Sequence, residues 1–138
     1  MKDCNCIFCK IAAGEIPSNT IYEDEKCRVI LDLSPATKGH ALILPKEHYA
    51  DIFSIEEEML GHVIQVAKKV GTHMKEVLGC EGLNLVQNNG TVAGQTVFHF
   101  HMHLIPRYES DENKGIIEWS HKEFTEEEMT AIRDSLKM

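Results

Sequence analysis

Three histidines stand two residues apart in the run from Thr96 to Ile105, at positions 99, 101 and 103. Side chains on a β-strand alternate between its two faces, so this spacing predicts a strand with all three imidazoles on one face. The apolar residues between them would point into a core; they are Phe98, Phe100, Met102 and Leu104. Imidazole is the side chain whose ordinary pKa lies nearest neutrality, so a face of three histidines is more typical of chemistry than of a solvated strand.

The composition limits the partners of the chain. Its 138 residues are 43% apolar and 26% charged, which is typical of one globular domain with a core of its own. The formal net charge of −8 argues against non-specific binding to nucleic acid or to an anionic membrane. No run is long enough to span a membrane, and the N-terminus lacks the apolar region of a secretion signal. We therefore expect a cytoplasmic protein whose five cysteines are reduced thiols or metal ligands.

Local patterns predict helices and strands in alternation. The predicted elements are a helix over residues 7–13, strands over 27–33, 40–44 and 83–87, a helix from 54 to 79, and a final helix from 125 onward. Capping boxes at Ser54–Glu57 and Thr125–Glu128 mark the starts of the two later helices, and Gly79 ends the long one. The apolar stripe of the long helix comprises Leu60, Val63, Ile64, Ala67, Val70, Met74, Val77 and Leu78. The last strand would pair antiparallel with the histidine strand, which predicts an α+β fold.

Two cysteines near the N-terminus have the spacing of metal ligands. Cys6 and Cys9 form a Cys-x-x-Cys pair, in which two thiolates can hold one tetrahedral Zn²⁺. A structural zinc site needs two further ligands, and His48 and His99 are our candidates. Residues i and i+4 on a strand lie roughly 13 Å apart, so His99 and His103 would not share one ion. The histidines therefore divide between two roles.

The sequence leaves alternatives open at this cysteine pair. Cys6 and Cys9 would equally suit a pair of reduced thiols at a helix start, and Cys4 is a possible substitute ligand. Cys27 and Cys80 have no partner at metal-ligand spacing, so we expect them to be buried apolar residues.

The middle histidine, His101, is the candidate nucleophile. A neutral imidazole nitrogen can attack phosphorus and form a covalent intermediate, which splits one difficult step into two. Polar groups that could stabilise charge on phosphate oxygens precede it at Asn88, Gly94, Gln95 and Thr96. Taken alone, the Asn-Asn-Gly sequence that begins at Asn88 is more typical of a plain turn.

These residues make the chain similar to a known family. The run His99-Phe100-His101-Met102-His103-Leu104-Ile105 resembles the His-φ-His-φ-His-φ-φ motif of the histidine triad (HIT) family, in which φ is apolar. Further similar segments are Cys6–Ile11, Glu15–Pro17, Tyr22–Asp24, Leu31–Pro35, Gly39–His40, Pro45–His48 and Gly94–Phe98. The resemblance covers residues 4 to 108 and is strongest to the Hint-like bacterial proteins, which are nucleoside phosphoramidases and dinucleotide hydrolases.

The resemblance implies a fold and an assembly. It implies one HIT domain over residues 1–138, with a core at about 4–108 and a C-terminal tail at 109–138. The expected fold is a five-stranded antiparallel sheet with one long helix and short terminal helices. Two such chains usually form a homodimer through the long helix and edge strands. Trp119 in the tail is then either a cover for a substrate pocket or an aromatic packed on its own subunit.

The resemblance also implies roles for individual residues. His101 matches the nucleophile, His103 the contact to the α-phosphate, His40 a fourth histidine that supports the triad, and Thr96 a group near the leaving group. The implied nucleotide contacts are Asn88, Gly94 and Gln95 at the phosphates, Asp32 at the ribose hydroxyls, and Phe8, Ile30 and Leu33 around the base. Related proteins bind structural zinc through a set that matches Cys6, Cys9, His48 and His99.

The expected function is therefore hydrolysis at the α-phosphate of a purine nucleoside monophosphate derivative, of the phosphoramidase type. One alternative is a dinucleoside polyphosphate hydrolase, which differs in its leaving group. Another is a nucleotide-binding interaction protein whose catalysis is incidental. A zinc hydrolase that uses the histidines as catalytic ligands would need an open coordination position, and the two thiolates argue against it.

Overall fold

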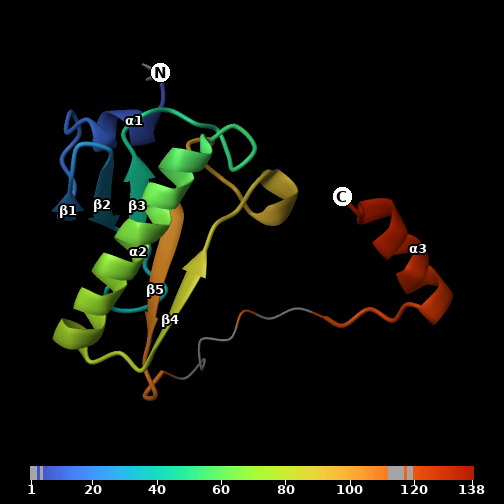
Figure 1. Ribbon diagram of the computed structural model, residues 1–138. Coiled ribbons are helices and arrows are strands. Elements are labelled where there is room, and N and C mark those ends of the chain that lie inside the picture. Colours follow the sequence, from blue (N-terminus) through green and yellow to red (C-terminus); the bar gives the residue numbers. More distant parts are fainter. Residues whose placement is uncertain (1–2, 4, 112–116, 118–119) are drawn as a thin grey trace.

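A five-stranded antiparallel sheet crossed by one long helix organises the chain (Figure 1). The computed structural model describes residues 3, 5–111, 117 and 120–138. Its elements are α1 (Ile7–Ala12), β1 (Thr20–Glu23), β2 (Cys27–Leu31), β3 (Ala41–Pro45), α2 (Glu57–Leu78), β4 (Gly82–Val86), the 3₁₀ turn η1 (Thr91–Ala93), β5 (Met102–Arg107) and α3 (Glu126–Leu136). The strands lie in the order β1-β2-β3-β5-β4, which confirms the expected α+β class and five-stranded sheet.

Alternation along the central strands creates two apolar layers. Val29 and Ile43 pack in the layer under α2, whereas Ile30 and Leu42 pack in the layer under α1. All five residues of β3 are buried, as expected for a strand covered on both faces. On α2 the buried residues are Val63, Val66, Ala67, Val70, Gly71 and Met74. This packing places α1 on the face of the sheet opposite α2, with β2 and β3 between the two helices.

The start of α2 differs from the prediction. The helix begins at Glu57 after Glu56, and Glu56 makes no side-chain cap, so the capping box predicted at Ser54 is wrong. The Ser54 hydroxyl instead exchanges hydrogen bonds with the backbone of Asp51, which occupies the group that would have capped the helix. The predicted end at Gly79 is confirmed, because this residue has the left-handed φ of 66° that favours glycine.

Other elements agree with the residue patterns in different degrees. The capping box at Thr125 and Glu128 is confirmed at α3, and β4 pairs antiparallel with β5 as predicted. Strand β1 was not predicted, because its four residues are mostly exposed and do not alternate. Ile64 and Val77 belong to the predicted apolar stripe of α2 but are 47% and 66% exposed. They lie at the flanks of the helix instead of beneath it.

The histidine run is less regular than one strand. Strand β5 begins only at Met102, so His103 is the one histidine of the three within it. The segment before β5 leaves the ladder because the Phe100 N–H donates to the Tyr49 carbonyl. Phe98, predicted in the core, is half exposed, whereas Phe100 is completely buried. The prediction of one continuous strand with Phe98 in its apolar face is therefore wrong.

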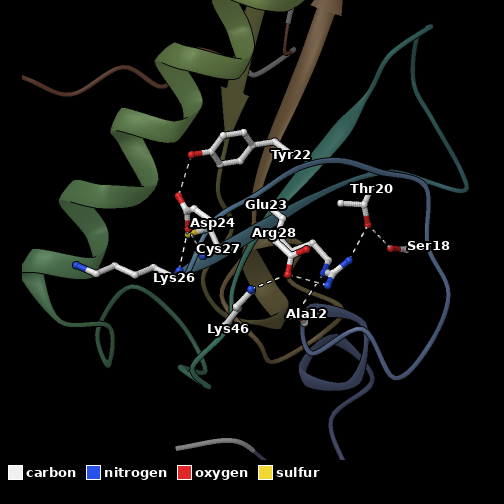
Figure 2. A network of polar contacts seen from close by, with 10 residues as sticks. All are labelled: Ala12, Ser18, Thr20, Tyr22, Glu23, Asp24, Lys26, Cys27, Arg28 and Lys46. Carbon is white, nitrogen blue, oxygen red and sulfur yellow. Dashed lines mark hydrogen bonds and ion pairs between the residues drawn. The ribbon is translucent and has the colours of Figure 1, made fainter.

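The turn between β1 and β2 is fixed by Asp24 (Figure 2). One carboxylate oxygen of Asp24 accepts hydrogen bonds from the backbone N–H groups of Lys26 at 2.8 Å and Cys27 at 2.7 Å. The other oxygen accepts the Tyr22 hydroxyl at 3.0 Å and lies 2.8 Å from Nε2 of His62 on α2. Burial alone would raise the pKa of Asp24, but these hydrogen bonds outweigh it and lower the pKa to about 2.

We expect Asp24→Asn to destabilise the protein at neutral pH and not in strong acid. The folded-state pKa of about 2 lies below the ordinary 3.8, so the carboxylate stabilises the fold above pH 3.8. That contribution, about 2 kcal/mol at 1.36 kcal/mol per pKa unit, is lost as the pH falls toward 2. Urea unfolding of both proteins at pH 7 and near pH 2.5 measures the difference. Asp134→Asn on exposed α3 is the control, and a wild-type advantage that stays constant with pH would contradict the assignment.

Among the described residues, no helix has the length and apolar character needed to cross a bilayer.

Candidate functional site

A cavity of about 420 Å³ opens between α1, the β2–β3 layer and the loop that leads into β5. Nine of the predicted site residues line it: Phe8, Ile30, Asp32, Leu33, Asn88, Gly94, Thr96, His101 and His103. Most of the apolar lining comes from α1 and from the β2–β3 pair, and the polar lining comes from Asp32 after β2, from the loop and from the histidines. The sequence missed five further lining residues, namely Ile7, Ile11, Leu31, Leu42 and Val97. Helical spacing in α1 relates Ile7, Phe8 and Ile11, and this was the available signal for two of them.

His101 has a defined tautomer. Its Nδ1 lies 2.7 Å from the His99 carbonyl oxygen. A carbonyl oxygen only accepts, so the proton is on Nδ1 and the lone pair is on Nε2. Burial lowers the pKa of His101, which keeps the ring neutral near pH 7. The Phe8 ring packs edge-on against it with centroids 5.0 Å apart, so the imidazole is held in place on two sides.

A chain of hydrogen bonds also sets the tautomers of His40 and His103. The Ala36 backbone N–H donates to His40 Nδ1 at 2.9 Å, so the His40 proton is on Nε2. That N–H lies 2.9 Å from His103 Nδ1 and 3.5 Å from an Asp32 carboxylate oxygen. With its Nδ1 accepting, His103 carries its own proton on Nε2, from which it can donate to a ligand. Burial and the neighbouring His101 and His40 lower the pKa of His103 to about 4, and burial lowers that of His40.

Two predicted residues lie behind the cavity instead of lining it. His40 is buried, and it contacts His103, which does line the cavity. Gln95 is also buried, and its side chain accepts from the Gly90 N–H and donates to the carbonyls of Ala50 and Val97. Its backbone N–H donates to the Gly90 carbonyl. Gln95 therefore braces the loop from within, and the loop presents other groups to the cavity.

The loop itself is shaped by a glycine. Gly94 has a φ of 95°, a conformation that side-chain-bearing residues rarely adopt, and it ends the turn η1. This reversal places Asn88 beside Gly94 and brings Thr96 to the cavity wall. The polar groups that face His101 and His103 thus come from a stretch without regular strand structure.

A second cluster joins the N-terminus to the histidine segment. His99 Nδ1 lies 3.4 Å from the sulfur atoms of both Cys6 and Cys9, and His48 Nδ1 lies 3.3 Å from that of Cys9. The four candidate ligand atoms all lie within 4.8 Å of one another. His99 Nε2 donates to the Pro45 carbonyl at 2.8 Å, which leaves the Nδ1 lone pair directed at the thiols.

This donor set fits a structural zinc ion. Two cysteine sulfurs and two imidazole nitrogens are a common closed tetrahedral set, and the outer hydrogen bond on His99 is the usual support for such a ligand. Cys27 and Cys80 are buried as predicted and lie outside this cluster. The alternative ligand Cys4 and the tail residue Trp119 both fall outside the described residues.

The family model described as the HIT domain matches residues 13–110. The chain belongs to the histidine triad family. This protein is 40% identical over 133 residues to Protein hit of Bacillus subtilis, a match that covers 96% of this chain and 92% of the relative. It is 36% identical over 132 residues to adenosine 5′-monophosphoramidase hnt1 of Schizosaccharomyces pombe, with 96% of each chain covered.

Solved structures of the histidine triad family share the fold. A HIT family protein from Bacillus anthracis matches with a TM-score of 0.86 and 43% identity, covering 96% of this chain and 95% of the other. A Zn-bound histidine triad family protein from Mycobacterium smegmatis matches with a TM-score of 0.76 and 34% identity, covering 96% and 93%. These matches agree with the Hint-like bacterial branch that the sequence resembles.

Proposed function

We propose that this histidine triad protein hydrolyses nucleoside monophosphate derivatives at the α-phosphorus, as a purine nucleoside phosphoramidase. The observation that carries the proposal is the His101 tautomer, which leaves a neutral, lone-pair-bearing nitrogen in a lined cavity. The S. pombe relative named adenosine 5′-monophosphoramidase supports this substrate class. A nucleotide-binding role with incidental catalysis would not require such a prepared nucleophile.

The reaction proceeds in two displacements. His101 Nε2 attacks the α-phosphorus, a nitrogen–phosphorus bond forms, and the bond to the leaving amine breaks. The amine departs with the electron pair and takes up a proton. Water then attacks the nucleotidyl-histidine, releases the nucleoside monophosphate and restores the lone pair. Throughout, the His99 carbonyl accepts from Nδ1 and stabilises the ring as it gains positive character.

The other cavity residues hold the substrate. The His103 Nε2–H donates to an α-phosphate oxygen, and Asn88, Gly94 and Thr96 surround the phosphates and leaving group. Asp32 accepts hydrogen bonds from the ribose hydroxyls. It lies beside His40, which orients His103. The walls around the base are Phe8, Ile30 and Leu33, and the 88% exposure of Leu33 places it at the mouth of the cavity.

Zinc has a supporting role in this proposal. Cys6, Cys9, His48 and His99 would hold the ion, which supplies a fixed tetrahedral anchor with no position open for substrate. His99 also supplies the carbonyl that orients His101, so this one residue connects the zinc site to the nucleophile. We further propose a cytoplasmic homodimer as the working form.

The test is release of AMP from adenosine 5′-phosphoramidate by the zinc-loaded protein. We expect turnover, with slower release from diadenosine polyphosphates at equal concentration. Faster turnover of the polyphosphates would favour the dinucleotide hydrolase instead. Tight AMP binding with no turnover of either substrate would contradict the enzymatic proposal and favour the nucleotide-binding role.

A further inference from the structure

The β2–β3 connection, residues 32–40, carries the backbone group that sets the His40 tautomer. The Ala36 N–H donates to His40 Nδ1 at 2.9 Å. The Asp32 carboxylate also attracts the His40 Nε2 proton, but its oxygen lies 3.5 Å from that nitrogen, beyond good hydrogen-bond length. The Ala36 amide is therefore the stronger determinant of where the His40 proton lies, and its position depends on the path of the β2–β3 connection.

Two side-chain hydroxyls fasten the β2–β3 connection to the end of β5. The Thr37 hydroxyl donates to the Pro106 carbonyl at 2.6 Å, and the Tyr108 hydroxyl donates to the Lys38 carbonyl at 2.7 Å. The two bonds run in opposite directions between the same two segments, and Thr37 and Lys38 directly follow Ala36. Together they fix the backbone on the C-terminal side of the Ala36 amide.

The sheet itself does not supply this attachment. Among the described residues, the pairing of β3 with β5 ends with Ala41 opposite Leu104. Proline has no N–H, so Pro106 could not donate to the β2–β3 connection. Gly39 passes so close to α2 that a Cβ there would lie 2.6 Å from Leu78 Cδ1, which confines the connection on that side. The two hydroxyls therefore hold the β2–β3 connection where the backbone ladder has ended.

We propose that Thr37 and Tyr108 are positioning residues whose hydroxyls hold the Ala36 amide in place. By fixing the His40 proton on Nε2, this amide keeps the His103 proton on Nε2 as well. This role rests on the proposed function, because the contact of His103 to the phosphate belongs to it. Neither hydroxyl-bearing residue lines the cavity, so both act through the two histidines.

Displacement of the Ala36 amide would reverse both tautomers. His40 could then carry its proton on Nδ1 and present a lone pair at Nε2. His103 would donate from Nδ1 to that lone pair, across the same 2.9 Å contact. Its Nε2 would then turn a lone pair, instead of a proton, toward the α-phosphate oxygen.

Imidazole ¹⁵N NMR shifts of the ligand-free, zinc-loaded protein test the tautomers without any turnover. In the wild type, Nε2 of both His40 and His103 should have the shift of a protonated nitrogen and Nδ1 that of an unprotonated one. Tyr108→Phe and Thr37→Val each remove one hydroxyl and should move all four shifts toward the values of mixed tautomers. Thr37→Ser keeps a hydroxyl and should retain the wild-type shifts. Unchanged shifts in the double variant Thr37→Val/Tyr108→Phe would overturn the proposal, since Asp32 would then suffice to set the tautomer.

Turnover of adenosine 5′-phosphoramidate measures the consequence for the reaction. We expect kcat to fall about 3- to 10-fold in Tyr108→Phe and about 10- to 100-fold when Thr37→Val is added, the range of one and two net hydrogen bonds. Tyr22→Phe is the matched control, because it removes a phenol hydrogen bond of 3.0 Å to Asp24 at the β1–β2 turn. It should lower stability without changing kcat or the ¹⁵N shifts.

Two results would overturn the positioning role, namely equal losses of kcat in Tyr22→Phe and Tyr108→Phe, or mixed tautomers with wild-type kcat. A wild-type protein without turnover would instead contradict the proposed function. The ¹⁵N shifts alone would then support or overturn the control of the tautomers by the two hydroxyls.

Discussion

His101→Ala is expected to abolish turnover of adenosine 5′-phosphoramidate while AMP still binds. The substitution removes the Nε2 lone pair that attacks phosphorus, and no other described group in the cavity lining offers a neutral nitrogen with its lone pair free. Loss of a nucleophile commonly costs three or more orders of magnitude in kcat, so we expect a fall of at least about 1,000-fold. Steady-state AMP release and AMP binding by calorimetry measure the two effects separately.

The matched control is His121→Ala, on an exposed tail residue, which should leave kcat unchanged. Rapid acid-free quenching and mass spectrometry should detect a nucleotidyl adduct on the peptide that contains His101 in the wild type and not in the variant. Turnover within tenfold of wild type in His101→Ala would remove this residue as the nucleophile. The neutral His103 would then be the next candidate, with its proton on the opposite nitrogen.

The order of elements was predictable where one local pattern decided the structure. Gly79 ends α2 because a left-handed residue is needed there, and Thr125 begins α3 through its own capping box. The histidine run was predicted as one strand because alternation is a local signal. The Phe100 N–H instead donates to Tyr49, a residue 51 positions earlier, and this tertiary contact delays β5 to Met102. No periodicity in the run itself contains that information.

In the candidate site too, some features could be predicted from the sequence and others could not. Side chains with distinctive chemistry, such as His101 and the Cys6–Cys9 pair, were identified from spacing; the structure places His101 in the cavity lining and brings the two cysteines together with His48 and His99. The Ala36 N–H that sets the His40 tautomer could not be identified, because a backbone donor leaves no mark on residue type. Gln95 was predicted among the phosphate-loop contacts and instead braces the loop through three backbone partners. Such supports depend on the folded path of the loop.

Zinc removal is expected to lower the stability of the protein without unfolding it at 25 °C. A ligand that binds only the folded state at 1,000 times its Kd stabilises by about 4 kcal/mol. For a chain of this size we therefore expect a chelator to lower the Tm by about 10 °C or more. Cys9→Ser, which removes the sulfur that contacts both His48 and His99, should lower zinc content below one ion per chain and abolish the chelator effect.

The same variant separates a structural ion from a catalytic one. The proposed zinc ligand His99 orients His101 only through its carbonyl, so Cys9→Ser should lower kcat about 10- to 100-fold, as loss of an outer support commonly does. A catalytic ion would instead make activity follow zinc content to zero. Cys80→Ala, at a buried thiol outside the cluster, is the control and should keep one zinc per chain. Residual turnover by zinc-free Cys9→Ser that is abolished by adding His101→Ala would show two things. The His101 imidazole performs the chemistry, and the metal stabilises the fold.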